Sequence, residues 1–97
     1  MNRFDLRITN LADQDLNDLY VEGITTWGEE QADRYYDGLV HRFARICENP
    51  FMYQAVDEIG AGYRRSVYER HSIYYVINGD AVEIRAVVKR QDFAARL

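Results

Sequence analysis

The sequence predicts an α+β fold: an N-terminal strand, then an antiparallel helix hairpin, then a three-stranded antiparallel meander. Three observations predict it. Polar and apolar residues alternate over residues 3–9, apolar residues recur at helical spacing over 10–48, and strand-forming residues around one tight turn fill 63–88. Helices and strands that separate along a chain in this way are typical of α+β domains. We expect one domain, residues 1–97, with the helix hairpin on one face of the sheet.

The first two elements follow from the change in period. From Phe4 to Ile8 apolar residues alternate with polar ones, which is the period of a half-buried strand. Asn10 predicts the start of a helix, because its side chain can accept a backbone N–H at the N-cap. Apolar residues then recur every three or four positions until Gly28, where we expect this helix to end.

A second helix is predicted to begin at Glu29, since acidic residues favour the positive end of a helix. One apolar stripe runs along it as far as Cys47. Asn49–Pro50 ends it, because a residue before proline avoids the helical region. The short link between the helices predicts an antiparallel hairpin. Residues 51–62 are expected to form a connecting loop.

Three strand-like segments follow. Tyr63–Arg70 alternates weakly between polar and apolar residues. Ser72–Ile77 is almost continuously β-branched or aromatic, which indicates a central strand covered on both sides. Asn78–Gly79 predicts a two-residue hairpin turn, because both residues tolerate positive φ, and Val82–Val88 is then the partner strand. Residues 89–97 are expected to be helical or extended.

Composition limits the classes of protein that this chain can belong to. Cys47 is the only cysteine, so no internal disulfide is possible, and we expect a buried residue in a cytoplasmic protein. No apolar run approaches the length of a membrane span. The net charge of −4 divides into −7 for residues 1–63 and +3 for 64–97. This asymmetry suggests either an acidic partner for the second half or charges that mix on folding. The sequence contains no Cys/His cluster, glycine-rich phosphate loop or nucleophile elbow, so we expect neither metal nor cofactor.

Several short motifs occur in a characteristic order. They are Leu11-Ala12-Asp13, Trp27-Gly28 with Gln31-Ala32 and Tyr35, Gly62-Tyr63-Arg64-Arg65, His71 with Ile73-Tyr74-Tyr75, and Val82-Glu83-Ile84. Their order and spacing resemble the ParE/RelE toxin superfamily over nearly the whole chain, and its ParE branch in particular. The chain departs from the pattern at Lys89, about where ParE relatives often have histidine. Asp92 still resembles the aspartate that follows in those relatives.

The resemblance implies the toxin of a type II toxin–antitoxin system. A ParE-like toxin would inhibit DNA gyrase by binding the protein, without catalysis and without direct nucleic-acid contact by the toxin alone, and a ParD-like antitoxin would neutralise it. We expect Lys89, Arg90, Asp92 and Phe93 to contact the target, because the tail is exposed and differs between branches of the superfamily.

The antitoxin needs a second surface. Its C-terminal segment would lie along the toxin as an amphipathic helix or strand. Tyr20, Trp27, Tyr35 and Tyr36 lie on or beside the predicted hairpin and are our candidates for that surface. The alternative is that these rings belong to the core.

The resemblance also leaves an enzyme open, namely a RelE-like ribosome-dependent mRNA endoribonuclease. Such cleavage needs cations and proton-transfer groups, for which Arg64, Arg65, His71 and Arg85 are the candidates. Alternation along a strand places Arg64 and Arg65 on opposite faces, and for His71 a hydrogen-bonded structural role is favoured over proton transfer. The net negative charge disfavours approach to an anionic ribosome. A third alternative is a non-toxic relative that keeps only the antitoxin interface.

Overall fold

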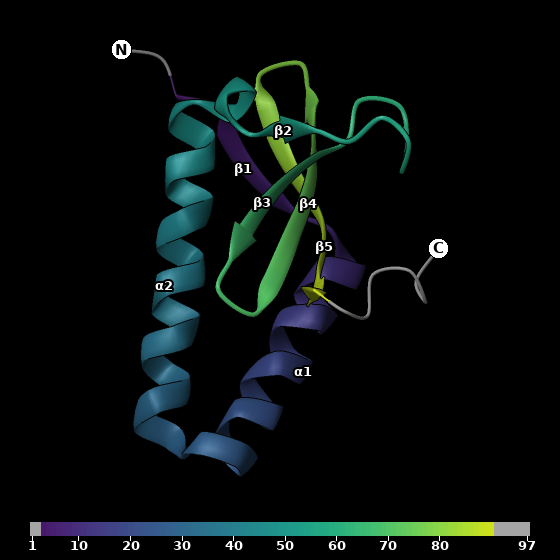
Figure 1. Ribbon diagram of the computed structural model, residues 1–97. Coiled ribbons are helices and arrows are strands. Elements are labelled where there is room, and N and C mark those ends of the chain that lie inside the picture. The colour runs from purple at the N-terminus through teal and green to yellow at the C-terminus, as the bar shows by residue number, and fades with distance from the viewer. Residues whose placement is uncertain (1–2, 91–97) are drawn as a thin grey trace.

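The computed structural model describes residues 3–90, which form two helices against a five-stranded sheet (Figure 1). The elements are β1 Asp5–Ile8, α1 Asn10–Trp27, α2 Glu29–Glu48, the 3-10 turn η1 Pro50–Met52, β2 Gln54–Ala55, β3 Arg64–Tyr68, β4 His71–Asn78 and β5 Ala81–Lys89. The strand order across the sheet is β1-β5-β4-β3-β2. The predicted α+β fold, with strand, helix hairpin and antiparallel meander in that order, is confirmed.

The sheet differs from the prediction in two details. β1 runs parallel to β5, with Leu6 opposite Val82, so the sheet is mixed. A short strand, β2, occurs within residues 51–62, where we expected only a loop. It pairs Gln54 with Arg65, and two residues are too few to show an alternating pattern in the sequence.

The helix hairpin begins one residue earlier than expected. The N-cap of α1 is Thr9, whose Oγ1 accepts a hydrogen bond from the Ala12 N–H at 3.2 Å, so the prediction of Asn10 as the cap is wrong. Asn10 already belongs to the helix. Gly28 joins the helices with φ of 95°, a conformation that favours glycine. From this joint the helices diverge as a V (Figure 1).

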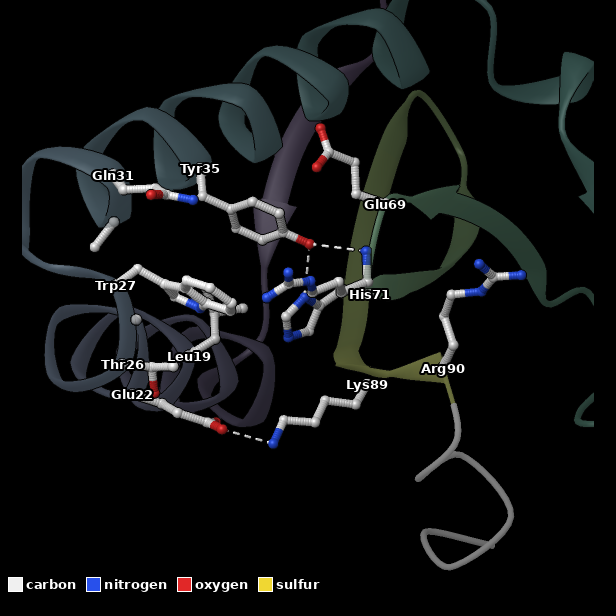
Figure 2. Close-up of a pocket in the computed structure, with 13 residues that line it drawn as sticks. Leu19, Glu22, Thr26, Trp27, Gln31, Tyr35, Glu69, His71, Lys89 and Arg90 are labelled. Carbon is white, nitrogen blue, oxygen red and sulfur yellow. Dashed lines mark hydrogen bonds and ion pairs between the residues drawn. The ribbon is translucent and has the colours of Figure 1, made fainter.

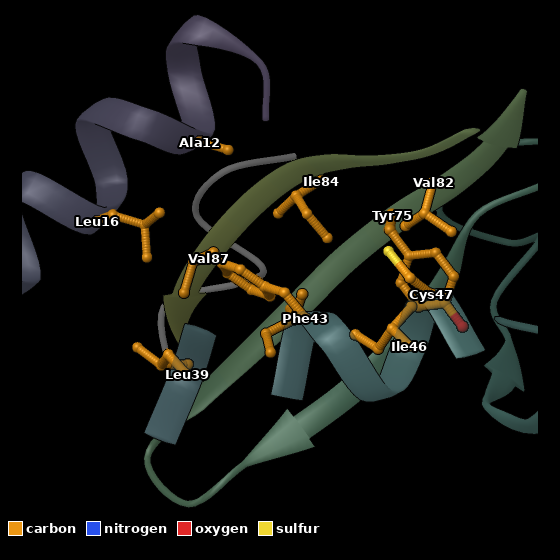
Figure 3. Packing of buried hydrophobic residues seen from close by; sticks show 11 residues of the cluster. Ala12, Leu16, Leu39, Phe43, Ile46, Cys47, Tyr75, Val82, Ile84 and Val87 are labelled. Carbon is orange, nitrogen blue, oxygen red and sulfur yellow. The ribbon is translucent and has the colours of Figure 1, made fainter. Parts of the chain in front are cut away.

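The main core lies between the helices and the sheet (Figure 3). Its fully buried members include Leu16, Leu39, Phe43, Ile46, Cys47, Ile73, Tyr75, Val82 and Ile84. A smaller cluster of Val56, Tyr74 and Val88 covers the opposite face. β4 therefore has apolar neighbours on both faces, as predicted for the central strand. Cys47 is buried, as expected.

A β-bulge in β5 decides which side chains reach the helices. Tyr74 pairs with Ala86 whereas Tyr75 pairs with Ile84, so Arg85 is the extra residue. An extra residue reverses the alternation of the strand beyond it. Lys89, which pairs with His71, consequently faces α1 instead of pointing away from it.

Candidate functional site

The candidate site is a groove of about 770 Å³ where the helix joint meets the ends of β4 and β5 (Figure 2). We call it the joint groove. Its lining comprises Leu19, Glu22, Gly23, Thr26, Trp27, Gln31, Ala32, Tyr35, Glu69, Arg70, His71, Lys89 and Arg90. The volume is in the range of pockets that bind small ligands or a few side chains of a partner. Helix side chains form its apolar floor, and charged side chains from the strand ends form its rim.

The floor depends on close contact between the two helices. Leu19 and Gly23 are four residues apart and therefore share one face of α1. A Cβ at Gly23 would lie 3.3 Å from the Cβ of Ala32 on α2, which is a tight contact. Two small residues thus let the helices approach near their joint and leave Tyr35 and Trp27 as the aromatic walls.

The hydroxyl of Tyr35 connects α2 to the turn between β3 and β4. It lies 3.1 Å from the Tyr68 carbonyl oxygen and 2.8 Å from His71 Nδ1, and it accepts the Arg70 N–H at 3.1 Å. Burial raises the pKa of Tyr35, so the hydroxyl keeps its proton at neutral pH. Glu69 in this turn has a φ of 49°, a left-handed conformation that surrounding contacts must hold.

His71 is a buried member of this network. Burial lowers its pKa, and the positive charge of Lys89 lowers it further, so the ring is neutral at pH 7. Its Nδ1 is engaged by Tyr35. These contacts support the structural role that we gave as one alternative for this histidine.

The rim carries cations next to the exposed ring of Trp27. The Arg70 guanidinium lies 4.2 Å from the centroid of that ring, close enough for a cation–π interaction. Lys89 Nζ pairs with the Glu22 carboxylate at 2.6 Å, which links the end of β5 to α1 across the groove (Figure 2). Arg90 is exposed, and its side chain points away from Trp27.

The structure brings together residues that the sequence assigned to two separate surfaces. Lys89 and Arg90, predicted to contact the target, share the joint groove with Trp27 and Tyr35, predicted to contact the antitoxin. The other two target candidates, Asp92 and Phe93, lie outside the described residues.

The remaining aromatic candidates lie elsewhere on the hairpin. Tyr20 and Tyr36 stack edge to face, with ring centroids 5.6 Å apart, between α1 and α2. The Tyr20 hydroxyl donates to Asp33, and this hydrogen bond raises the pKa of Tyr20 to about 12. Both rings are half-buried, and Tyr36 packs against the main core.

The four residues proposed for a nuclease do not form one cluster. Strand pairing places Arg64 and His71 on the helix side of the sheet and Arg65 on the other side. Arg64 donates to the carbonyl oxygens of Phe51 and Tyr53. Arg65 donates to the side chain of Gln54.

The fourth nuclease candidate is held by a neighbouring carboxylate. Arg85 pairs with Glu83 at 3.0 Å, and its guanidinium lies 5.9 Å from the Tyr63 ring centroid. Hydrogen bonds from Asn78 and Arg85 lower the pKa of Glu83, and the Glu83 hydrogen bond raises that of Arg85. A structural ion pair with Glu83 therefore accounts for the position of the Arg85 side chain.

Sequence reasoning missed Glu22 and Arg70. Glu22 resembles the other acidic residues of α1, and only its three-residue spacing from Leu19 hints that it borders the buried face. Arg70 ends a strand-like segment, and no pattern in the sequence brings it to Trp27. Over residues 3–90, no group of three His, Cys, Asp or Glu side chains could hold a metal ion, and neither helix is long and apolar enough to cross a membrane.

Comparison with known proteins gives matches over most of the chain. Residues 6–92 match the family model described as the ParE toxin of the type II toxin–antitoxin system parDE. Toxin ParE1 of Caulobacter vibrioides is 35% identical over 82 residues, which are 84% of this chain and 84% of that protein. Toxin ParE1 of Mycobacterium tuberculosis (strain H37Rv) is 34% identical over 68 residues, 68% of this chain and 69% of that protein.

Two solved structures share the fold at low sequence identity. The chromosomal ParDE toxin–antitoxin system from P. aeruginosa superposes with a TM-score of 0.79 at 18% identity, covering 90% of this chain and 96% of that one. The toxin–antitoxin complex RelBE2 from Mycobacterium tuberculosis gives a TM-score of 0.71 at 21% identity, covering 95% and 97%.

Proposed function

This chain belongs to the ParE toxin family of type II toxin–antitoxin systems, and from that membership we propose that it inhibits DNA gyrase by protein binding and is silenced by a ParD-like antitoxin. Gyrase acts on the bacterial chromosome, so the proposal places the protein in the cytoplasm. The toxin would bind its target as a protein partner and carry out no reaction of its own.

The composition of the joint groove carries this proposal. Lys89 and Arg90 border the same hollow as Trp27 and Tyr35. An antitoxin segment that packs on the aromatic residues would therefore also cover Lys89. Neutralisation would then be steric, because one surface cannot hold the antitoxin and the target together.

A binding role fits the geometry better than a catalytic one. Arg64 and Arg85 are held by structural partners on opposite faces of the sheet. The Nδ1 of His71 is engaged by Tyr35 within a buried network. A nuclease would need these groups to converge on one phosphate with a free proton-transfer group among them.

The proposal is tested in cells that express the chain without an antitoxin. We expect DNA breaks and filamentation while early protein synthesis continues. Lys89→Glu should relieve the effect, because it reverses a charge at the predicted contact. Arg34→Glu is the matched control, since Arg34 is an exposed cation on α2 that pairs with Glu30 and does not line the groove.

Purified gyrase gives a second readout. The chain should increase cleaved-DNA complexes in a gyrase reaction, and the Lys89→Glu variant should do so less than the wild type. A rapid stop in translation with cut messages would contradict the proposal. Full growth with folded protein in the cells would contradict it as well.

A further inference from the structure

We infer that the joint groove receives an acidic and apolar segment of the antitoxin, whose carboxylate replaces that of Glu22 on Lys89. The inference rests on the proposed function, because it takes an antitoxin as the occupant. It adds the chemistry of the segment that binds and a second role for Glu22.

The apolar part of the inference comes from the groove floor. Leu19, Ala32 and the rings of Tyr35 and Trp27 line one hollow of about 770 Å³. Trp27 is 47% exposed, although a tryptophan ring gains much from burial. A partner that inserts apolar side chains here would cover this ring, as amphipathic segments do in hydrophobic grooves.

The acidic part comes from the charge around that floor. The lining holds three cations, Arg70, Lys89 and Arg90, and two carboxylates, Glu22 and Glu69, although the whole chain carries −4. The groove is thus less acidic than the chain as a whole, and two of its cations lie at defined places in it, Arg70 over the Trp27 ring and Lys89 beside Glu22. Charge complementarity of this kind favours partners of the opposite sign and repels the others.

The Glu22–Lys89 pair shows where a carboxylate fits. Its two side chains are 54% and 39% exposed, and an exposed ion pair changes an equilibrium constant by no more than about fivefold. Releasing Glu22 therefore costs little, and a carboxylate of the partner would take over its contact with Lys89. Arg70, which lies over Trp27, would add a second cation beside the bound segment.

Trp27 provides the readout, because it is the only tryptophan in the chain and lies in the groove. The probes are three short acetylated peptides in which leucine alternates with glutamate, glutamine or lysine. We expect the glutamate peptide to change Trp27 fluorescence and to bind about tenfold more tightly than the glutamine peptide, which is the effect of about 1.4 kcal/mol of added charge interaction. The lysine peptide should bind most weakly.

Variants of the ion pair sharpen the test. Glu22→Gln removes the competing carboxylate, so the glutamate peptide should bind roughly twofold to fivefold more tightly, whereas Lys89→Gln should weaken its binding by a similar factor. Glu30→Gln is the matched control, since Glu30 also pairs with a cation on the hairpin but does not line the groove. It should leave the affinity unchanged.

Several results would overturn the inference. Equal binding of the three peptides, tighter binding of the lysine peptide, or no effect of Glu22→Gln would each refute an acidic occupant. If a ParD-like antitoxin silences the toxin but binds Glu22→Gln and Lys89→Gln as it binds the wild type, the inference fails while the proposed function stands. If no such antitoxin binds the chain at all, the proposed function fails, and the assignment of the occupant fails with it.

Discussion

Replacing Tyr35 with phenylalanine tests whether one hydroxyl holds the turn of the joint groove in place. The change keeps the ring and its packing but removes contacts with the Tyr68 carbonyl, His71 Nδ1 and the Arg70 N–H. A hydrogen bond contributes about 1 kcal/mol, and a buried polar group left without a partner costs about 1–3 kcal/mol. Water can reach the exposed turn at Arg70 and compensate for part of the lost hydrogen bonding, so we expect the free energy of unfolding to fall by about 2 kcal/mol.

The thermal shift follows from the size of the domain. The entropy of unfolding is about 2.1 cal/mol/K per residue, so 97 residues give about 0.2 kcal/mol/K, and a loss of about 2 kcal/mol lowers Tm by about 10 °C. Circular dichroism during heating measures this shift. Trp27 fluorescence should change as well, because the Arg70 backbone loses its hydrogen bond to Tyr35 and the Arg70 guanidinium is then held less firmly over the Trp27 ring.

Tyr36→Phe is the control. Tyr36 is half-buried like Tyr35, but within residues 3–90 its hydroxyl makes no hydrogen bond. Its loss should change Tm by no more than about 2 °C, since it removes no hydrogen bond of the fold. If both variants melt together, the Tyr35 hydroxyl does not stabilise the turn, and the reasoning is wrong.

Three further perturbations test the fold around the groove. His71 has a lowered pKa in the folded chain, so it binds fewer protons there than in the unfolded chain. The contribution of His71 to the free energy of unfolding should therefore be fully present above about pH 6.5 and be lost as the pH drops through that lowered pKa, with a slope of up to about 1.4 kcal/mol per pH unit. Denaturant titrations between about pH 8 and 5 should show a smaller slope for His71→Gln than for the wild type, whereas His41→Gln should keep the wild-type slope. Gly38→Ala would place a Cβ against the Tyr68 hydroxyl, so the variant should lose about 1–2 kcal/mol despite better helix propensity, and in a Tyr68→Leu background the loss should disappear. Asp15→Ala removes the acceptor of a β5 backbone N–H and should lower the free energy of unfolding by about 1–2 kcal/mol, whereas an unchanged denaturation midpoint would show that water replaces the carboxylate.

The order and type of the long elements could be predicted because the spacing of apolar residues along the sequence indicates them directly. α2 has one apolar stripe that ends at Asn49–Pro50, and β4 is apolar on both faces. The start of α1 was wrong by one residue, since Thr9 and Asn10 are both good caps and only the backbone shows which of them is helical. β2 was missed because two residues carry no period.

The site was harder to predict than the fold, because it depends on which side chains of β5 face the helices. Counting alternate residues from Val82 and Ile84 places Lys89 on the side of the sheet away from the helices. The bulge at Arg85 turns it toward α1, where Glu22 meets it. A bulge arises from the pairing of two strands, so neither strand's own sequence states it.

Lys89 is the residue at which the chain departs from the family pattern, and its charge also acts on a buried side chain of the domain. The charge of Lys89 attracts Glu22 across the groove, and it also helps to lower the pKa of His71 on the neighbouring strand. A neutral His71 keeps a lone pair or a single N–H for Tyr35, which in turn holds the turn that carries Arg70. A fixed positive charge at position 89 thus favours the protonation state on which the shape of the groove depends. Lys89, which we expect to contact the target, is thus coupled electrostatically to the Tyr35–His71 pair that holds the groove together.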